Sequence, residues 1–152
     1  MKRYVPLDTG IIGLLCSSPM IQEVADCRAW IYRMIAIKTS VVLPDVTVYE
    51  ARREMIRAGA TVKLTRLGDL LKVFGRAPVT PDAWQKADEF WALVRSAGRP
   101  TADPHALDGD AILAGVAATI GARGDVVTIA TSNVGHLATF PGIDARRWEA
   151  IS

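Results

Sequence analysis

The chain has 152 residues, of which 50% are hydrophobic, and a formal net charge of +2 at pH 7. A chain of this size can bury one sizeable core but is too short for two ordinary domains, so we expect a single domain over residues 1–152. A net charge this small does not identify a nucleic-acid partner by itself. No apolar run approaches the roughly 18 residues of a membrane-spanning helix, which argues against a membrane protein.

The N-terminus is the one segment that resembles an export signal. A basic tripeptide, residues 1–3, precedes an apolar stretch, but Pro6, Asp8 and Gly10 interrupt it, and the uninterrupted run at 11–16 is short. A signal peptide requires an apolar region of about 7 to 15 residues followed by a small-residue cleavage site. We therefore expect a cytoplasmic protein.

The two cysteines, Cys16 and Cys27, lie in apolar, helix-like surroundings. Neither has the paired spacing of a zinc site. Free cysteines are among the residues most often found in protein interiors. We expect both to be buried free thiols.

The first half of the chain alternates short β-branched runs with longer amphipathic segments. The pattern predicts strands at 4–7 and 41–43. It predicts helices at 11–16, from Pro19 to about residue 38, and at 46–58. The segment 61–74 is predicted to be a helix, or a strand that turns into a helix. The junction between residues 7 and 11 is a strand that leads directly into a helix.

In the second half of the chain, the pattern predicts a helix at 81–97, a polar loop at 99–107 and an apolar helix at 111–120. A turn at 121–125 leads to a strand at 126–130, and a short helical turn at 133–137 and a last strand at 143–145 follow. Strands that alternate with helices are typical of an α/β fold. We expect a mainly parallel central sheet with helices on both faces.

Acidic and amide residues follow the predicted strands. Asp8 ends the first strand, Asp110 opens the apolar helix at 111–120, and Asn133 follows the strand at 126–130. Ligand sites of parallel sheets collect beyond the carboxyl ends of the strands. Glu50 lies within the helix after the second strand, among largely apolar neighbours, where a carboxylate needs a partner. Carboxylates brought together repel one another unless a divalent cation neutralises them, and oxygen ligands suit Mg²⁺ or Mn²⁺.

Four segments resemble, in order, the motifs of the PIN-domain family and its VapC-like toxins of type II toxin–antitoxin modules. They are YVPLDTGIIGLL, LPDVTVYEARREM, LDGDAILAGVAA and VVTIATSNVGHLATF, and they extend over nearly the whole chain. The resemblance implies a PIN-like fold and a Mg²⁺- or Mn²⁺-dependent endoribonuclease that hydrolyses RNA phosphodiester bonds. It assigns Asp8, Glu50 and Asp110 to the metal, and Asn133 to completing the shell or positioning water.

Two features depart from that family pattern or leave a role open. Asn133 occupies a position where many relatives have aspartate, so one charge is missing and a second metal is in question. Asp108 precedes Asp110 by two residues, and residues so spaced do not share a helix face. It is either the N-cap of the helix or a further metal ligand.

Each site residue also has a structural interpretation. Asp8 can cap the helix that follows it, Asp110 can favour the helix dipole, and Asn133 can form an Asx turn. Glu50 can pair with an arginine on its own helix, either Arg53 or Arg57. Thr9, Thr131 and Ser132 can hold carboxylates or phosphate oxygens, or serve only as turn residues. His105 and His136 lack spaced partners and are interpreted as structural or surface residues.

The segment 52–76 carries seven basic residues against two acidic ones, which favours a basic surface. From it we select Arg53 and Arg57 as candidate RNA contacts. The resemblance further implies a homodimer and a small cognate antitoxin, and the exposed aromatic residues expected on the helix at 83–95 agree with an interface.

The alternative function is a catalytically weakened PIN-like domain that binds nucleic acid or a partner. The string at residues 7–10, Leu-Asp-Thr-Gly, also matches the aspartic-protease motif. Such enzymes are nearly all β and need a second copy of the motif, so the helical pattern of this chain argues against that activity.

Overall fold

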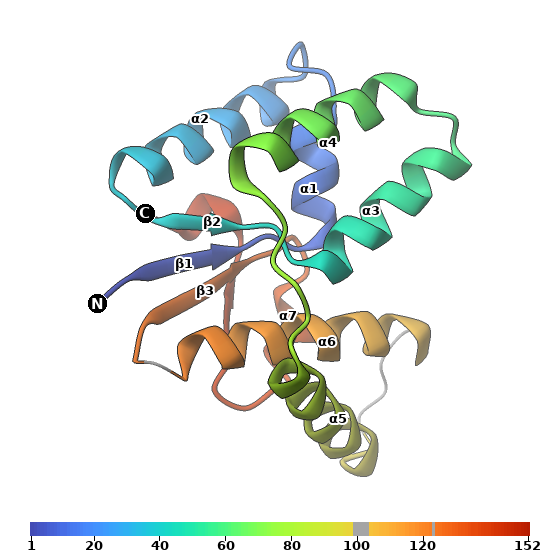
Figure 1. Ribbon diagram of the computed structural model, residues 1–152, viewed down its shortest axis with the longest axis vertical. Helices are drawn as coiled ribbons and strands as arrows, with labels where there is room; N and C mark the ends of the chain where they lie inside the picture. Colours follow the sequence, from blue (N-terminus) through green and yellow to red (C-terminus); the bar gives the residue numbers. More distant parts are fainter. Residues whose placement is uncertain (99–103, 123) are drawn as a thin grey trace.

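The computed structural model describes residues 1–98, 104–122 and 124–152. Within these ranges four parallel strands form one sheet in the order β2-β1-β3-β4 (Figure 1). The strands are β1 (Arg3–Pro6), β2 (Ser40–Val42), β3 (Val126–Ala130) and β4 (Asp144–Arg146).

The α-helices of the described residues follow the strands in alternation. They are α1 (Thr9–Cys16), α2 (Gln22–Ala36), α3 (Asp45–Arg57), α4 (Thr61–Phe74), α5 (Pro81–Ser96), α6 (Pro104–Gly121) and α7 (Val134–Leu137), and a 3₁₀-helix, η1 (Trp148–Ala150), lies near the C-terminus. In Figure 1, α1 to α4 lie on one side of the strands and α5 and α6 on the other. This is the α/β arrangement that the alternation of strands and helices predicts.

Two hydrophobic cores cover the sheet, one on each face. Ile129 and Ala130 are neighbours on β3, yet Ile129 packs with α5 and α6 whereas Ala130 packs with α1 to α4. Successive strand residues point to opposite faces, so a strand with two buried faces must be apolar at consecutive positions. The predicted covering of both faces is therefore confirmed.

The carboxyl end of β1 is held by both neighbouring strands. The Leu7 amide donates to the Val42 carbonyl at 2.9 Å, and the Asp8 amide donates to the Ala130 carbonyl at 3.0 Å. The hydroxyl of the fully buried Thr47 donates to the Leu7 carbonyl at 2.9 Å. These bonds fix the ends of β1, β2 and β3, and the start of α3, next to one another.

The largest difference from the predicted elements concerns α6. This helix begins at Pro104, whereas the sequence predicts a loop at 99–107; residues 99–103 lie outside the described residues, and 104–107 are helical. Proline is favoured at the first helical position. Leu107 is 3% exposed and packs in the same core as Phe90, so tertiary burial extends the helix beyond its obviously apolar part.

Smaller differences affect other helix ends and one strand. The helix expected to open at Pro19 begins at Gln22, the segment 61–74 is wholly helical, and the last strand is shifted by one residue to Asp144–Arg146. None of these changes moves a predicted site residue.

Both cysteines are free and buried, as predicted. Burial raises the pKa of Cys16 to about 11 and that of Cys27 to about 12. Both thiols therefore stay protonated and unreactive at neutral pH. No helix among the described ranges is long and apolar enough to cross a membrane.

Candidate active site

Asp8 lies at the junction of β1 and α1, with both carboxylate oxygens held. As the N-cap of α1 it accepts a hydrogen bond from the Thr9 amide at 2.7 Å through Oδ1. Its Oδ2 accepts from the Thr131 hydroxyl at 2.6 Å. The interpretation of Asp8 as the cap of the helix that follows it is confirmed. Two short bonds to one carboxylate fix its orientation toward the ends of the strands.

Glu50 approaches the same region from α3, and its side chain is 25% exposed. Its Oε1 accepts a hydrogen bond from the Thr9 hydroxyl at 3.0 Å, and its Oε2 lies 3.9 Å from the Arg53 guanidinium. A Cβ at Gly109 would lie 2.8 Å from Oε2, so α6 passes close to the glutamate, and a larger residue at this position would require the Glu50 side chain to shift.

Asp110 completes the set from α6, with a side chain that is 21% exposed. The pKa of Asp110 is raised from 3.8 to about 6, chiefly by burial and next by the negative charge of Asp8; His136 opposes this rise and Glu50 adds to it. The electrostatic effect of both other carboxylates on Asp110 indicates that the three share one environment. The expectation that Asp110 opens its helix is wrong, because α6 begins six residues earlier.

Asn133 precedes α7 and is exposed. Its backbone N–H donates to the Thr131 hydroxyl oxygen at 2.9 Å, and its side-chain Nδ2 lies 3.1 Å from Nδ1 of His136. The same Nδ1 is 3.5 Å from Oδ2 of Asp110. Asn133 is therefore connected to Asp110 through His136, and its side chain makes no capping bond to α7.

His136 is a site residue that the sequence analysis missed, since it was interpreted as structural or surface. Its signal in the sequence is weak: it follows Asn133 by three residues, the spacing that places two side chains on one face of a helical turn. The partner that brings it into the site, Asp110, belongs to another helix. Nothing is described for the side chain of His105.

Two threonines join these groups into a network. Thr131 is fully buried, donates to Asp8 and accepts from the Asn133 amide, so it links the ends of β1 and β3. Thr9 connects Asp8 to Glu50 through its amide and hydroxyl. Of the three hydroxyl residues considered from the sequence, these two hold carboxylates, and Ser132 is exposed.

The secondary candidates from the sequence are Asp108, Arg53 and Arg57, and the structure places them differently with respect to the acidic residues. Asp108 cannot be the N-cap of α6, because the helix begins four residues before it, and its side chain is exposed. Arg53 lies beside the carboxylates, with its guanidinium 4.9 Å from the centre of the Tyr49 ring. Arg57 pairs with Glu54 rather than with Glu50.

The donor set of this site suits a hard divalent cation, because carboxylate and amide oxygens are the ligands that Mg²⁺ and Mn²⁺ prefer. Across residues 1–98, 104–122 and 124–152, however, no three His, Cys, Asp or Glu side chains converge closely enough to hold a metal ion in the present conformation. Glu50 is turned toward Thr9, and Asp110 toward His136. Binding a metal would therefore require these two partly exposed side chains to reorient.

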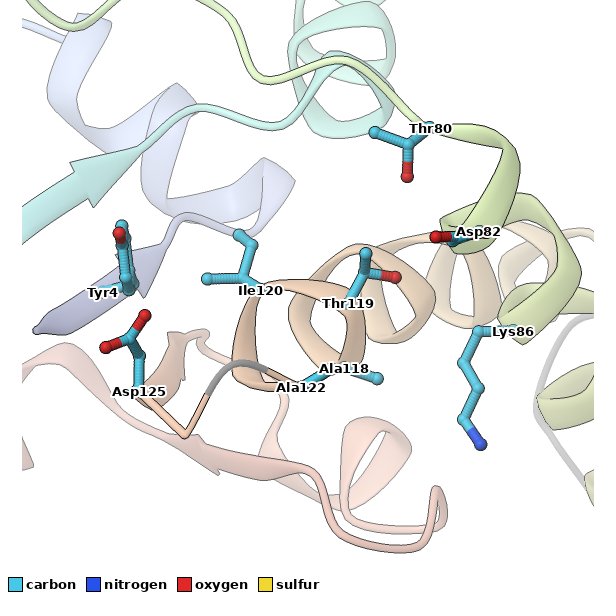
Figure 2. Close-up of a pocket in the computed structure, with 9 residues that line it drawn as sticks. All are labelled: Tyr4, Thr80, Asp82, Lys86, Ala118, Thr119, Ile120, Ala122 and Asp125. Atoms are coloured by element: carbon cyan, nitrogen blue, oxygen red, sulfur yellow. The ribbon is translucent and has the colours of Figure 1, made fainter. Parts of the chain in front are cut away.

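Two hollows of similar size lie on the surface. One, of about 710 Å³, borders the acidic residues and includes Glu50 and Asp108 in its lining. The other, of about 750 Å³, lies at the C-terminal end of α6, away from them. Figure 2 shows that its two carboxylates, Asp82 and Asp125, stand on opposite sides of it. The clustered carboxylates favour the first location for chemistry.

Comparison with known proteins establishes the fold. No family model and no curated protein sequence matches the chain. It is similar to VapBC2 from Rickettsia felis, solved with a DNA fragment from its promoter, with a TM-score of 0.74 at 12% identity over 95% of this chain and 98% of that one. It is also similar to VapBC-1 from nontypeable Haemophilus influenzae, with a TM-score of 0.67 at 14% identity over 96% and 98% of the two chains.

FitAcB from Neisseria gonorrhoeae has the same fold, with a TM-score of 0.64 at 18% identity over 97% of this chain and 99% of that one. These similarities extend over nearly the whole chain, and at such low identity they concern the fold alone. The predicted PIN-like α/β architecture is confirmed.

Proposed function

We propose that this protein is a Mg²⁺- or Mn²⁺-dependent endoribonuclease, the VapC-like toxin of a toxin–antitoxin pair that acts in the cytoplasm. The observation that carries the proposal is that Asp8, at the end of β1, has Glu50 of α3 and Asp110 of α6 as neighbours. There, the charges of Asp8 and Glu50 both raise the pKa of Asp110. Three carboxylates that repel one another destabilise the free protein, so their presence favours a cation site over a structural role.

The fold supports the same assignment. The similar solved structures include VapBC proteins, and the acidic residues that carry the PIN resemblance support the toxin rather than the antitoxin. In this proposal Asp8, Glu50 and Asp110 hold the metal. When bound, Mg²⁺ or Mn²⁺ supplies activation of water and neutralisation of the phosphate charge.

The protein's own groups contribute positioning and charge. The Thr131 hydroxyl and the Thr9 amide fix Asp8, so its carboxylate needs no reorganisation during the reaction. The Asn133 carboxamide orients water or a phosphate oxygen through hydrogen bonds without adding charge. Burial and the negative charges of Asp8 and Glu50 raise the pKa of Asp110 in the metal-free protein, and a bound cation would offset the repulsion among these charges. Arg53, at the edge of the site, contacts the RNA backbone, and Arg57 has a weaker claim because Glu54 already pairs with it.

The proposed partners are a second copy of the chain and a small antitoxin. Of the aromatic residues of α5 outside the groove beside the acidic site, Trp91 is 41% exposed, whereas Phe90 is buried in the core. Half-exposed tryptophans are typical anchors of protein interfaces. An antitoxin inhibits most directly by directing an arginine or lysine toward the three carboxylates, where it pairs with them in place of the metal.

A catalytically weakened PIN-like domain is the second candidate. Asn133 favours it, because the fourth position carries no charge, and so does the lack of convergence of the carboxylates in the described residues. Calorimetric titration with Mn²⁺ discriminates the two functions. The nuclease binds Mn²⁺ and loses this binding in Asp8→Asn, whereas a degenerate site binds no metal in either form.

The decisive experiment measures cleavage of a single-stranded RNA labelled with a fluorophore and a quencher. We expect cleavage by the wild-type protein with Mg²⁺ or Mn²⁺, and none by Asp8→Asn or Asp110→Asn. Asp69→Asn, at an exposed position on α4, is the matched control and should retain activity. Cleavage by either site variant at the wild-type rate would refute the site assignment, provided that the variants melt cooperatively.

A further inference from the structure

The groove of about 710 Å³ beside the acidic site is bordered by α3, α6, the N-terminal part of α5 and the segment that precedes it. Its lining residues are Asp45, Val46, Tyr49, Glu50, Arg53, Pro78, Val79, Trp84, Asp108, Gly109 and Ile112. Its volume is in the range of pockets that bind small organic molecules. One end is formed by Glu50 and by Gly109, which packs against it. The groove is thus continuous with the carboxylates.

Two aromatic side chains in this groove are exposed to solvent. Tyr49 on α3 is 58% exposed and Trp84 on α5 is 49% exposed. The core uses its aromatic residues differently, since Trp30 and Trp148 are 1% and 6% exposed and pack against each other. Aromatic surface left in water beside a cluster of carboxylates is available for a flat ligand to stack on.

A positive charge lies at the same place. The Arg53 guanidinium is 4.9 Å from the centre of the Tyr49 ring and also lies beside Glu50. The acidic Asp45 is paired with Arg76 at 2.8 Å, which reduces repulsion of an anionic ligand there. The remaining acids of the groove are Glu50 and Asp108. Beside them, the groove offers aromatic faces and a guanidinium.

This combination fits an unpaired nucleotide. Nucleobases stack on tyrosine, tryptophan and guanidinium planes, and phosphates pair with arginine. A base within a duplex has both faces covered by its neighbours and cannot use such a groove. Aromatic side chains and arginine also occur in protein interfaces, but the groove borders the acidic site at which the RNA phosphate is proposed to bind, which favours the RNA strand as its occupant.

We propose that this groove is the subsite for an unpaired nucleobase of the RNA strand, adjacent to the phosphate held at the acidic site. The inference rests on the proposed ribonuclease function. In it, Tyr49 and Trp84 stack on the base and Arg53 contacts the neighbouring phosphate. The protein consequently prefers single-stranded RNA at the position of cleavage, and it tolerates different bases because every base has an aromatic face.

The test is a double-mutant cycle between Trp84 and one base. The ligands are a fluorescein-labelled single-stranded RNA and a series of the same RNA in which each nucleotide in turn is abasic. Wild-type protein and Trp84→Ala are titrated into each RNA in Ca²⁺, and binding is followed by fluorescence anisotropy. Base stacking is worth about 1 to 3 kcal/mol, so one abasic position should weaken wild-type binding by about 5- to 150-fold. In Trp84→Ala, intact RNA should bind as weakly, and the same abasic position should have no further effect.

Three variants serve as controls. Tyr32→Ala removes an exposed aromatic side chain on α2, outside the groove, and should leave the abasic penalty intact. Trp84→Phe and Tyr49→Phe retain an aromatic face and should preserve most of the affinity. Cooperative thermal unfolding of Trp84→Ala excludes misfolding as the cause of any loss in that variant.

The possible failures are distinguishable. If the wild-type protein cleaves RNA with Mn²⁺ but Trp84→Ala retains the full abasic penalty, the subsite is overturned and the proposed function stands. The subsite is also overturned if Trp84→Ala binds RNA normally but loses affinity for a protein partner, because the groove is then a protein-binding surface. If the wild-type protein neither binds nor cleaves single-stranded RNA, the proposed function fails, and the subsite fails with it.

Discussion

Replacement of Asp110 by asparagine should stabilise the metal-free protein at neutral pH. The carboxyl group has its pKa raised from 3.8 to about 6, so the folded protein holds the proton more tightly than the unfolded chain does. The contribution of Asp110 to the free energy of unfolding is therefore most favourable below pH ~4 and decreases as the pH rises toward 6. Above that value the folded protein carries the full cost of the ionised, partly buried carboxylate. Asparagine does not ionise and removes this penalty.

The size of the effect follows from the shift. About two pKa units correspond to an upper value of about 3 kcal/mol. The lost contact with His136 and the remaining 21% exposure of the side chain reduce it, so we expect about 1 to 3 kcal/mol. For a chain of this length each kcal/mol moves Tm by about 2 to 4 °C. The variant should melt about 2 to 12 °C above the wild type.

The assay is thermal unfolding followed by circular dichroism at pH 4 and pH 7.5 in EDTA, and again at pH 7.5 with Mn²⁺. The stability gain should be present at pH 7.5 in EDTA and absent at pH 4, where Asp110 is protonated in the wild type. Mn²⁺ should raise the Tm of the wild type alone, because ligand binding stabilises the state that binds it. Asp69→Asn should show no such gain. A variant that melts below the wild type at both pH values would refute the electrostatic reasoning.

Three further predictions concern metal, positioning and assembly. Cleavage should require Mg²⁺ or Mn²⁺ and cease in excess EDTA, whereas Ca²⁺ should bind with poor catalysis; undiminished cleavage in EDTA would instead indicate metal-free acid–base chemistry. Thr131→Val should weaken Mn²⁺ binding by about 10- to 100-fold in calorimetry, because Asp8 loses its hydroxyl donor, and an unchanged affinity would contradict that role. Sedimentation equilibrium at micromolar concentration should yield a dimer that Trp91→Ala weakens; a strict monomer would remove the proposed interface.

The order of the elements could be predicted from the sequence because periodicity is a local property. Alternation of β-branched runs with amphipathic segments predicted the parallel sheet, and the strand-to-helix junction placed Asp8 at a strand end. The start of α6 could not be predicted in this way. The segment before Asp108 contains prolines and polar residues and is typical of a loop, and only the burial of Leu107 against the core explains why its end is helical.

The partners of the site residues were decided by the tertiary structure. Thr9 and Glu50 are 41 residues apart, and Thr131 and Asp8 are 123 apart, so no local pattern indicates their hydrogen bonds. They meet because β1 and β3 are paired in the sheet and α3 is anchored to the end of β1. The sequence determined which residues carry charge and near which strand ends they lie. Packing of α6 and α7 decided that His136 faces Asp110, since that contact joins two helices whose relative position only the whole fold defines.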